Sequence, residues 1–229
     1  MTGTLAHLVA AAIAFVGGHF LISSTPLRWA IVAKIGERAY LGVFSALAVV
    51  ALAWLGLAYR AAPRIELWAW ETGGRHLALT LVALASVFVV AGLTTPSPTV
   101  AGAGERGLDE ARGIVRVTRH PFLWGVALWA VAHLAANGDS ASVVLFASLM
   151  VLALAGTLAI DRKRKASLGE AWERFAGATS NAPFAAIASR RQRLDFAEIG
   201  IWRILGAVAL YVALLFGHEL VIGVDPLGG

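Results

Sequence analysis

The feature that most constrains this chain is a series of apolar segments, each long enough to cross a bilayer as a helix. A helix needs roughly 20 apolar residues to span about 30 Å of hydrocarbon. Segments of this kind are predicted at residues 4–23, 39–59, 77–93, 121–137, 140–160 and 199–222. The predicted fold class is therefore all-α: a polytopic membrane protein with about six transmembrane helices in one bundle and a single domain over residues 1–229.

The basic residues predict how these helices are oriented. Nearly all of the 19 lysines and arginines lie in or beside three loops, at residues 24–38, 94–120 and 161–198. The remaining loops hold only Arg60, Arg64 and Arg75. Loops rich in lysine and arginine stay on the cytoplasmic side of a membrane. We therefore expect these three loops in the cytoplasm and both chain termini on the periplasmic side.

Composition narrows the classes of partner. Only 14% of the residues are charged, whereas soluble domains have about one quarter. The net charge is +5, and the basic residues responsible for it lie between the apolar spans. We therefore expect them to attract anionic lipid headgroups, and we expect no nucleic acid partner. The sequence has no cysteine, which excludes thiolate ligands and thiol nucleophiles. The oligomeric state is not predicted.

Two histidines fall well inside predicted spans, away from the span ends, where an ionisable side chain generally has a function. His19 lies well inside the first span, and His133 lies inside the fourth, one turn after Trp129. Because no Asp or Glu occurs in the first three spans, two neutral imidazoles suit a haem iron or another transition metal that prefers imidazole. The histidines near outer span ends are interpreted as ordinary interfacial residues, at positions 7, 76 and 218.

The depth of each histidine leaves the choice of pair open. At about 1.5 Å per residue, His19 lies about 9 Å and His133 about 18 Å from the predicted cytoplasmic boundary. That difference is compatible with two ligands across an inclined macrocycle, but not with a compact tetrahedral ion. His120 lies nearer the cytoplasmic boundary than either, at the mouth of the fourth span. His19 with His120 therefore remains a competing pair.

A basic stripe leads into His120. Arg112, Arg116 and Arg119 are spaced as one face of a helix. Such a stripe is typical of headgroup contact, and it also suits an anionic group such as a haem propionate or a lipid phosphate. Asp161, at the edge of the fifth span, is a carboxylate that can orient a histidine or an arginine.

Several clusters resemble the NnrU family of bacterial membrane proteins, in order, over roughly residues 15 to 190. They include Gly18-His19-Phe20, Pro26-Leu27-Arg28, Thr118-Arg119-His120-Pro121, Trp124-Gly125, Leu128-Trp129, Ala132-His133-Leu134, Asn137-Gly138-Asp139 and Gly169-Glu170-Ala171-Trp172. The resemblance implies a protein of the bacterial inner membrane, linked to nitric-oxide and nitrite metabolism in denitrifying bacteria.

The NnrU family is similar to zeta-carotene isomerase of plants and cyanobacteria, a membrane protein that holds haem b between two histidines. By motif, those ligands fall on His19 and His133, which makes haem b the expected cofactor. We expect Trp129 to pack near the haem ring, with Arg119 and His120 lining the inner mouth. The implied function is a redox-dependent isomerase of a lipid-soluble substrate or an accessory of nitric-oxide metabolism. Whether the protein is an enzyme is left open.

A second resemblance gives the alternative function. Arg119-His120-Pro121 with Gly125 is similar to membrane methyltransferases of the isoprenylcysteine type, in which such a segment helps to hold S-adenosylmethionine. The usual tyrosine after the proline is replaced here by Phe122-Leu123. The paired downstream glutamates are replaced by Glu170 and Glu173. The alternative to a haem protein is thus an S-adenosylmethionine-dependent methyltransferase.

Overall fold

Helices form along the apolar segments because backbone N–H and C=O groups in a bilayer must bond within their own segment. The structure is a computed structural model that describes residues 3–100, 102 and 104–228. In this part of the chain the elements are α1 (Leu5–Ser24), α2 (Pro26–Ile35), α3 (Glu37–Ala61), α4 (Glu71–Thr94), η1 (Gly113–Arg116), α5 (Pro121–Ala136), α6 (Ser140–Ala178), α7 (Ala185–Ala188), α8 (Phe196–Ile199) and α9 (Ile201–Ile222).

The predicted all-α membrane fold is confirmed. Five described helices are long and apolar enough to cross a bilayer, namely α1, α3, α4, α6 and α9. The apolar α5 is shorter, at 16 residues. Pro121 occupies its first turn, where a missing N–H costs nothing. Together these helices account for the approximately six spans that the sequence predicts.

The expected loops contain more helix than the sequence predicts. Helix α6 continues 18 residues past the predicted end of the fifth span, through a non-helical kink at Gly169 (φ 51°, ψ −126°). The apolar stretch ends near Ile160, but the Lys, Arg, Ala and Glu residues that follow are strong helix formers in water. The expected loop 24–38 likewise contains α2, and the described part of loop 94–120 contains η1. Residues 101 and 103 of that loop lie outside the described residues.

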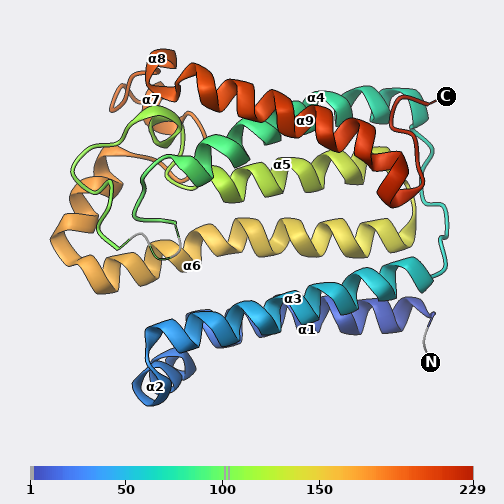
Figure 1. Ribbon diagram of the computed structural model, residues 1–229, viewed down its shortest axis with the longest axis horizontal. Coiled ribbons are helices and arrows are strands. Elements are labelled where there is room, and N and C mark those ends of the chain that lie inside the picture. The colour runs from blue at the N-terminus through green and yellow to red at the C-terminus, as the bar shows by residue number, and fades with distance from the viewer. Residues whose placement is uncertain (1–2, 101, 103, 229) are drawn as a thin grey trace.

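The long helices run side by side, and both chain termini lie at the same end of the bundle (Figure 1). We call this the outer end, because the termini are predicted to be periplasmic. Helix α6 packs against α1 on one side and α5 on the other, while α4 packs against α5 and α9. Leu8, Phe15 and Leu55 form part of the buried core between α1 and α3. This order of helices decides which side chains can meet.

Glycines bring α4 and α5 unusually close together. A Cβ atom added at Gly92 would lie 2.6 Å from the backbone nitrogen of Phe122, and one added at Gly125 would lie 2.8 Å from Val89. Such distances are shorter than van der Waals contact, so each position requires a residue without a Cβ. Small residues allow membrane helices to approach closely in this way. The crossing fixes α5, which carries Trp129 and His133 and directly follows His120.

Candidate functional site

The structure places the predicted site residues in separate parts of the bundle. A cavity of about 260 Å³ lies at the outer end, between α4, α5 and α9. Its walls are mainly apolar and include Leu79, Val82, Trp129, Leu214 and Leu215. Arg75, Asn137 and Tyr211 add polar groups. We call this the outer cavity; an apolar cavity with a few polar groups is the usual form of a small-molecule site.

His133 lines the outer cavity and is held by its own helix. Its Nδ1 atom donates a hydrogen bond to the carbonyl oxygen of Trp129, at 2.8 Å. The imidazole ring also contacts Trp129 and Phe146, with ring centroids 4.4 and 4.8 Å apart. Because a carbonyl oxygen can only accept, Nδ1 carries the proton and Nε2 keeps its lone pair. The predicted neighbour of the site, Trp129, thus sets the orientation of His133.

His218 lines the same cavity from α9, and its ring is held in the same way. Its Nδ1 atom donates to the carbonyl oxygen of Val224, at 2.7 Å. Gly223 makes this contact available, because its left-handed conformation (φ 82°, ψ 19°) ends α9 and turns the chain back. The rings of His133 and His218 are 6.4 Å apart between centroids. The outer cavity therefore has two imidazoles, each with the proton on Nδ1.

His19 lies elsewhere, between the aromatic rings of Phe15 and Phe44, with centroids 5.3 and 4.9 Å away. Helix α6 lies between its helix, α1, and the helix of His133, α5 (Figure 1). At about 1.5 Å per residue, His19 is about 21 Å from the outer end of α1 and His133 about 5 Å from that of α5. Nitrogens that share one metal ion lie about 4 Å apart. This arrangement therefore does not fit a haem iron held by His19 and His133.

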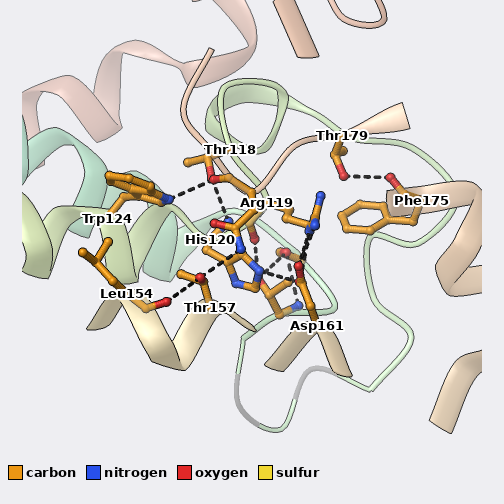
Figure 2. A network of polar contacts seen from close by, with 12 residues as sticks. Thr118, Arg119, His120, Trp124, Leu154, Thr157, Asp161, Phe175 and Thr179 are labelled. Atoms are coloured by element: carbon orange, nitrogen blue, oxygen red, sulfur yellow. Dashed lines mark hydrogen bonds and ion pairs between the residues drawn. The ribbon is translucent and has the colours of Figure 1, made fainter. Parts of the chain in front are cut away.

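The other predicted residues, Arg119 and His120, form a cluster at the inner end of α5, which Figure 2 shows. Arg119 donates to both carboxylate oxygens of Asp161, through Nε to Oδ1 at 3.0 Å and through Nη2 to Oδ2 at 2.5 Å. Nε2 of His120 lies 2.6 Å from Oδ1 of the same carboxylate. The prediction that Asp161 orients a histidine or an arginine is confirmed, and it orients both. We call these three residues the inner cluster.

Buried polar contacts hold the inner cluster in place. The hydroxyl of Thr118 and the indole N–H of Trp124 both donate to the carbonyl oxygen of Asn181, at 2.5 and 2.8 Å. The amide of Asn181 in turn donates to Thr157 on α6, at 2.9 Å. Segment 117–120, α6 and loop 179–184 are thereby joined. His120 is 2% exposed, and burial lowers its pKa despite the neighbouring Asp161.

The inner cluster is turned inward and does not line the outer cavity. Arg119 and His120 direct their side chains to Asp161, so the groups expected to hold S-adenosylmethionine already have a partner. Nδ1 of His120 is buried and has no hydrogen-bond partner among the described residues. The cluster's clearest effect is structural, since it ties α5 to α6 at the point where the apolar part of α6 ends.

No group of three or more histidine and carboxylate side chains that could hold a metal ion occurs within the described residues. A metal bound by the outer cavity would therefore take two imidazoles from the protein and its other ligands from elsewhere. Sequence analysis assigned His218 to the membrane interface. Its position near the end of an apolar segment carried no other signal, because the contact with His133 joins residues 85 positions apart.

Comparisons with known proteins give a family and two relatives. A family model described as "NnrU protein" matches residues 7–226. The chain is 40% identical over 82 residues to 15-cis-zeta-carotene isomerase, chloroplastic, of Zea mays, covering 36% of this chain and 22% of that protein. It is 34% identical over 114 residues to the protein of the same name from Arabidopsis thaliana, covering 48% of this chain and 31% of that protein. No solved structure matches the chain.

Proposed function

The chain belongs to the NnrU family, and we propose that it is a membrane-embedded isomerase that binds part of an elongated, lipid-soluble molecule in the outer cavity. The two relatives are named as isomerases of a carotene, which is a long apolar polyene. The corresponding reaction for this chain is the cis–trans isomerisation of a double bond in such a molecule. It forms and breaks no σ bond and needs only a transient loss of π bonding.

The observation that carries this proposal is the outer cavity. Its apolar walls come from three membrane helices, and Leu214, one of its lining residues, is 42% exposed at the surface of α9. Leu214 thus borders both the cavity and the exposed face of α9, which suits entry of a substrate that dissolves in the bilayer. A cavity of about 260 Å³ holds a segment of a long chain and leaves the rest in lipid. His133, His218 and Tyr211 are among the polar side chains that line this space.

The protein's own residues contribute shape and orientation to this reaction. Trp129 lies beside His133, with its ring tilted by 41° to the imidazole, and its indole forms part of the cavity wall, which suits the face of a conjugated chain. Tyr211 and Asn137 supply hydrogen-bonding groups at the border of an apolar space. Haem b remains a prediction from the family resemblance, and no step of the proposed reaction is assigned to it, because His19 and His133 do not fit one iron here.

The test uses the full chain purified into lipid nanodiscs, with a 15-cis polyene such as 15-cis-zeta-carotene as the substrate. Conversion to the trans isomer is measured by chromatography against nanodiscs without protein. Leu215→Trp fills the cavity and is expected to reduce conversion at least tenfold. Leu220→Trp is the matched control, because Leu220 is on the same helix but 89% exposed. Equal conversion by both variants, or none by the unaltered protein, would overturn the proposal.

The alternative methyltransferase and the nitric-oxide accessory stay predictions. The burial of Arg119 and His120 against Asp161 favours neither. Equilibrium dialysis of the purified protein with labelled S-adenosylmethionine tests the methyltransferase directly. Saturable binding that Arg119→Ala abolishes would favour that function over isomerisation.

A further inference from the structure

We propose that Arg28, Lys163 and Arg164 form a binding site for the phosphate group of an anionic phospholipid, at the end of the bundle opposite the chain termini. We call these three residues the basic cluster. None of them lines the outer cavity, and none belongs to the inner cluster. The site is therefore separate from the proposed isomerisation and does not depend on it.

Three helices bring the basic cluster together. Arg28 lies on α2, whereas Lys163 and Arg164 lie on α6 just past its apolar part. Nζ of Lys163 donates to the carbonyl oxygen of Ser23 at the end of α1, at 3.5 Å. The ring of Tyr40 lies 5.2 Å from the guanidinium of Arg28, and its hydroxyl also donates to the end of α1, at 3.1 Å. The ends of α1 and α6 and the start of α2 thus converge on one point.

The basic cluster carries more positive charge than its protein neighbours compensate. Glu37 pairs with Arg28 at 2.5 Å, but Lys163 and Arg164 donate to backbone carbonyl oxygens, at 3.5 and 3.3 Å. Burial lowers the pKa of Lys163 and of Arg164, and repulsion from Arg28 lowers both further, with Glu37 acting in the opposite direction. Three cations therefore share the one carboxylate that acts on them among the described residues. A bound anion would relieve their repulsion.

Burial distinguishes the basic cluster from the other basic residues of the same helix segment. The side chain of Arg28 is 13% exposed, and Lys163 and Arg164 are half-buried, whereas Arg162 and Lys165 are exposed. Long basic side chains usually extend their charged ends into water, and charges held away from water are generally paired. The missing partner of this cluster is therefore an anion that the chain itself does not supply.

The position of the basic cluster favours a lipid as the source of that anion. Helix α2 lies at the end of the bundle opposite the termini (Figure 1), beside the point where the apolar part of α6 ends. Leu27 and Trp29, which flank Arg28 in the sequence, are 41% and 56% exposed, and tryptophan is typical of the headgroup level. Guanidinium and ammonium groups bind phosphate oxygens strongly, and basic pockets between membrane helices bind anionic headgroups. A free phosphate ion would use the same basic groups without the adjoining apolar surface.

The experiment uses the full chain, delipidated in detergent and titrated with dioleoyl-phosphatidylglycerol or dioleoyl-phosphatidylcholine. Native mass spectrometry counts the bound lipid. The two lipids have the same acyl chains and differ in headgroup charge. Inorganic phosphate and glycerol 3-phosphate are titrated separately, as probes of a site for a free anion. Lys163→Gln is compared with Lys165→Gln, which removes the same charge two positions along α6 from a side chain that is 67% exposed.

The expected result is saturable binding of phosphatidylglycerol, about tenfold tighter than that of phosphatidylcholine or of either free anion. Lys163→Gln should weaken it about tenfold, whereas Lys163→Arg and Lys165→Gln should leave it unchanged. Equal affinities for the two lipids, equal effects of Lys163→Gln and Lys165→Gln, or equally tight binding of a free anion would each overturn the proposal.

The unfolding temperature separates loss of the site from loss of the fold. Lys163→Gln removes a cation that its neighbours repel, so without lipid it should unfold at the same temperature as the unaltered protein or higher. Phosphatidylglycerol should raise the unfolding temperature of the unaltered protein and of Lys165→Gln, but not that of Lys163→Gln. A lower unfolding temperature of lipid-free Lys163→Gln would show that the cation stabilises the fold without an anion, which contradicts the proposal.

Discussion

His120 and Asp161 join the start of α5 to the middle of α6, with Nε2 of the imidazole 2.6 Å from Oδ1 of the carboxylate. Arg119 binds the other side of the same carboxylate, and the side chains of Arg119 and Asp161 are 13% and 18% exposed. A single carboxylate therefore holds both a guanidinium group and an imidazole ring. Because Arg119 and His120 directly precede α5 and Asp161 belongs to α6, their contacts tie the start of α5 to α6.

Removing Asp161 should destabilise the protein strongly. Asp161→Ala leaves Arg119 without its partner in a mostly buried position, and loss of one member of a buried ion pair typically costs about 3–5 kcal/mol. We expect a clear fall in the unfolding temperature measured in detergent. Arg112→Ala is the control, since Arg112 and its partner Glu110 are 70% and 54% exposed, and such pairs contribute about 0–1 kcal/mol. Equal effects of the two changes would contradict a structural role for the inner cluster.

Adding a methyl group at Gly92 should separate α4 from α5. The new Cβ would lie 2.6 Å from the backbone nitrogen of Phe122, so the two helices must move apart, at a cost of typically about 1–3 kcal/mol. Gly18→Ala provides the comparison, because no atom lies within 4 Å of the Cβ position there. The Gly18→Ala protein should have the same unfolding temperature as the unaltered protein or a higher one, since alanine has a higher helix propensity than glycine. Unfolding temperatures measured side by side distinguish the two, and an unchanged Gly92→Ala protein would argue against the close crossing.

Acidification should loosen the contact between η1 and α8. Hydrogen bonds from Arg116 and from the backbone N–H of Gly113 lower the pKa of Glu198 from 4.5 to about 2. Because the pKa is lower in the folded protein, this contact stabilises it above about pH 4.5, and the contribution is lost as the pH falls toward 2. The difference in unfolding temperature between the unaltered protein and Glu198→Gln should therefore shrink between pH 6 and pH 2. Glu173→Gln, at an exposed pair with Lys165, should show little difference at any pH.

The orientation in the membrane can be tested with single cysteines, because the sequence contains none. Leu227→Cys near the outer end and Arg193→Cys after α7 are both exposed positions. A membrane-impermeant maleimide added to intact spheroplasts should label the first variant at once and the second only after permeabilisation. The opposite pattern would reverse the orientation predicted from the basic loops.

The sequence by itself was sufficient for the helices that cross the membrane. The features that define these helices are local in the sequence. They are the length of each apolar segment, the proline that begins α5, and Asp139, which caps α6 by accepting a hydrogen bond from the backbone N–H of Ser142. For this reason the predicted spans 121–137 and 140–160 agree closely with the end of α5 and the start of α6. Sequence analysis missed the extension of α6 beyond residue 160, because hydropathy indicates where the apolar part of a helix ends and not where the helix itself ends.

The candidate site depends on contacts that no local pattern contains. Sequence position gave the depth of each histidine along its helix, but not which helices are neighbours. Helix α6 packs between α1 and α5 and so separates His19 from His133, whereas α4 and α9 enclose the cavity that His133 shares with His218. The contact of Asp161 with a basic side chain could be predicted, because a carboxylate at the edge of a span needs a partner. The pairing of His133 with His218 was not, because only the lateral order of the helices and the turn at Gly223 bring the two rings together.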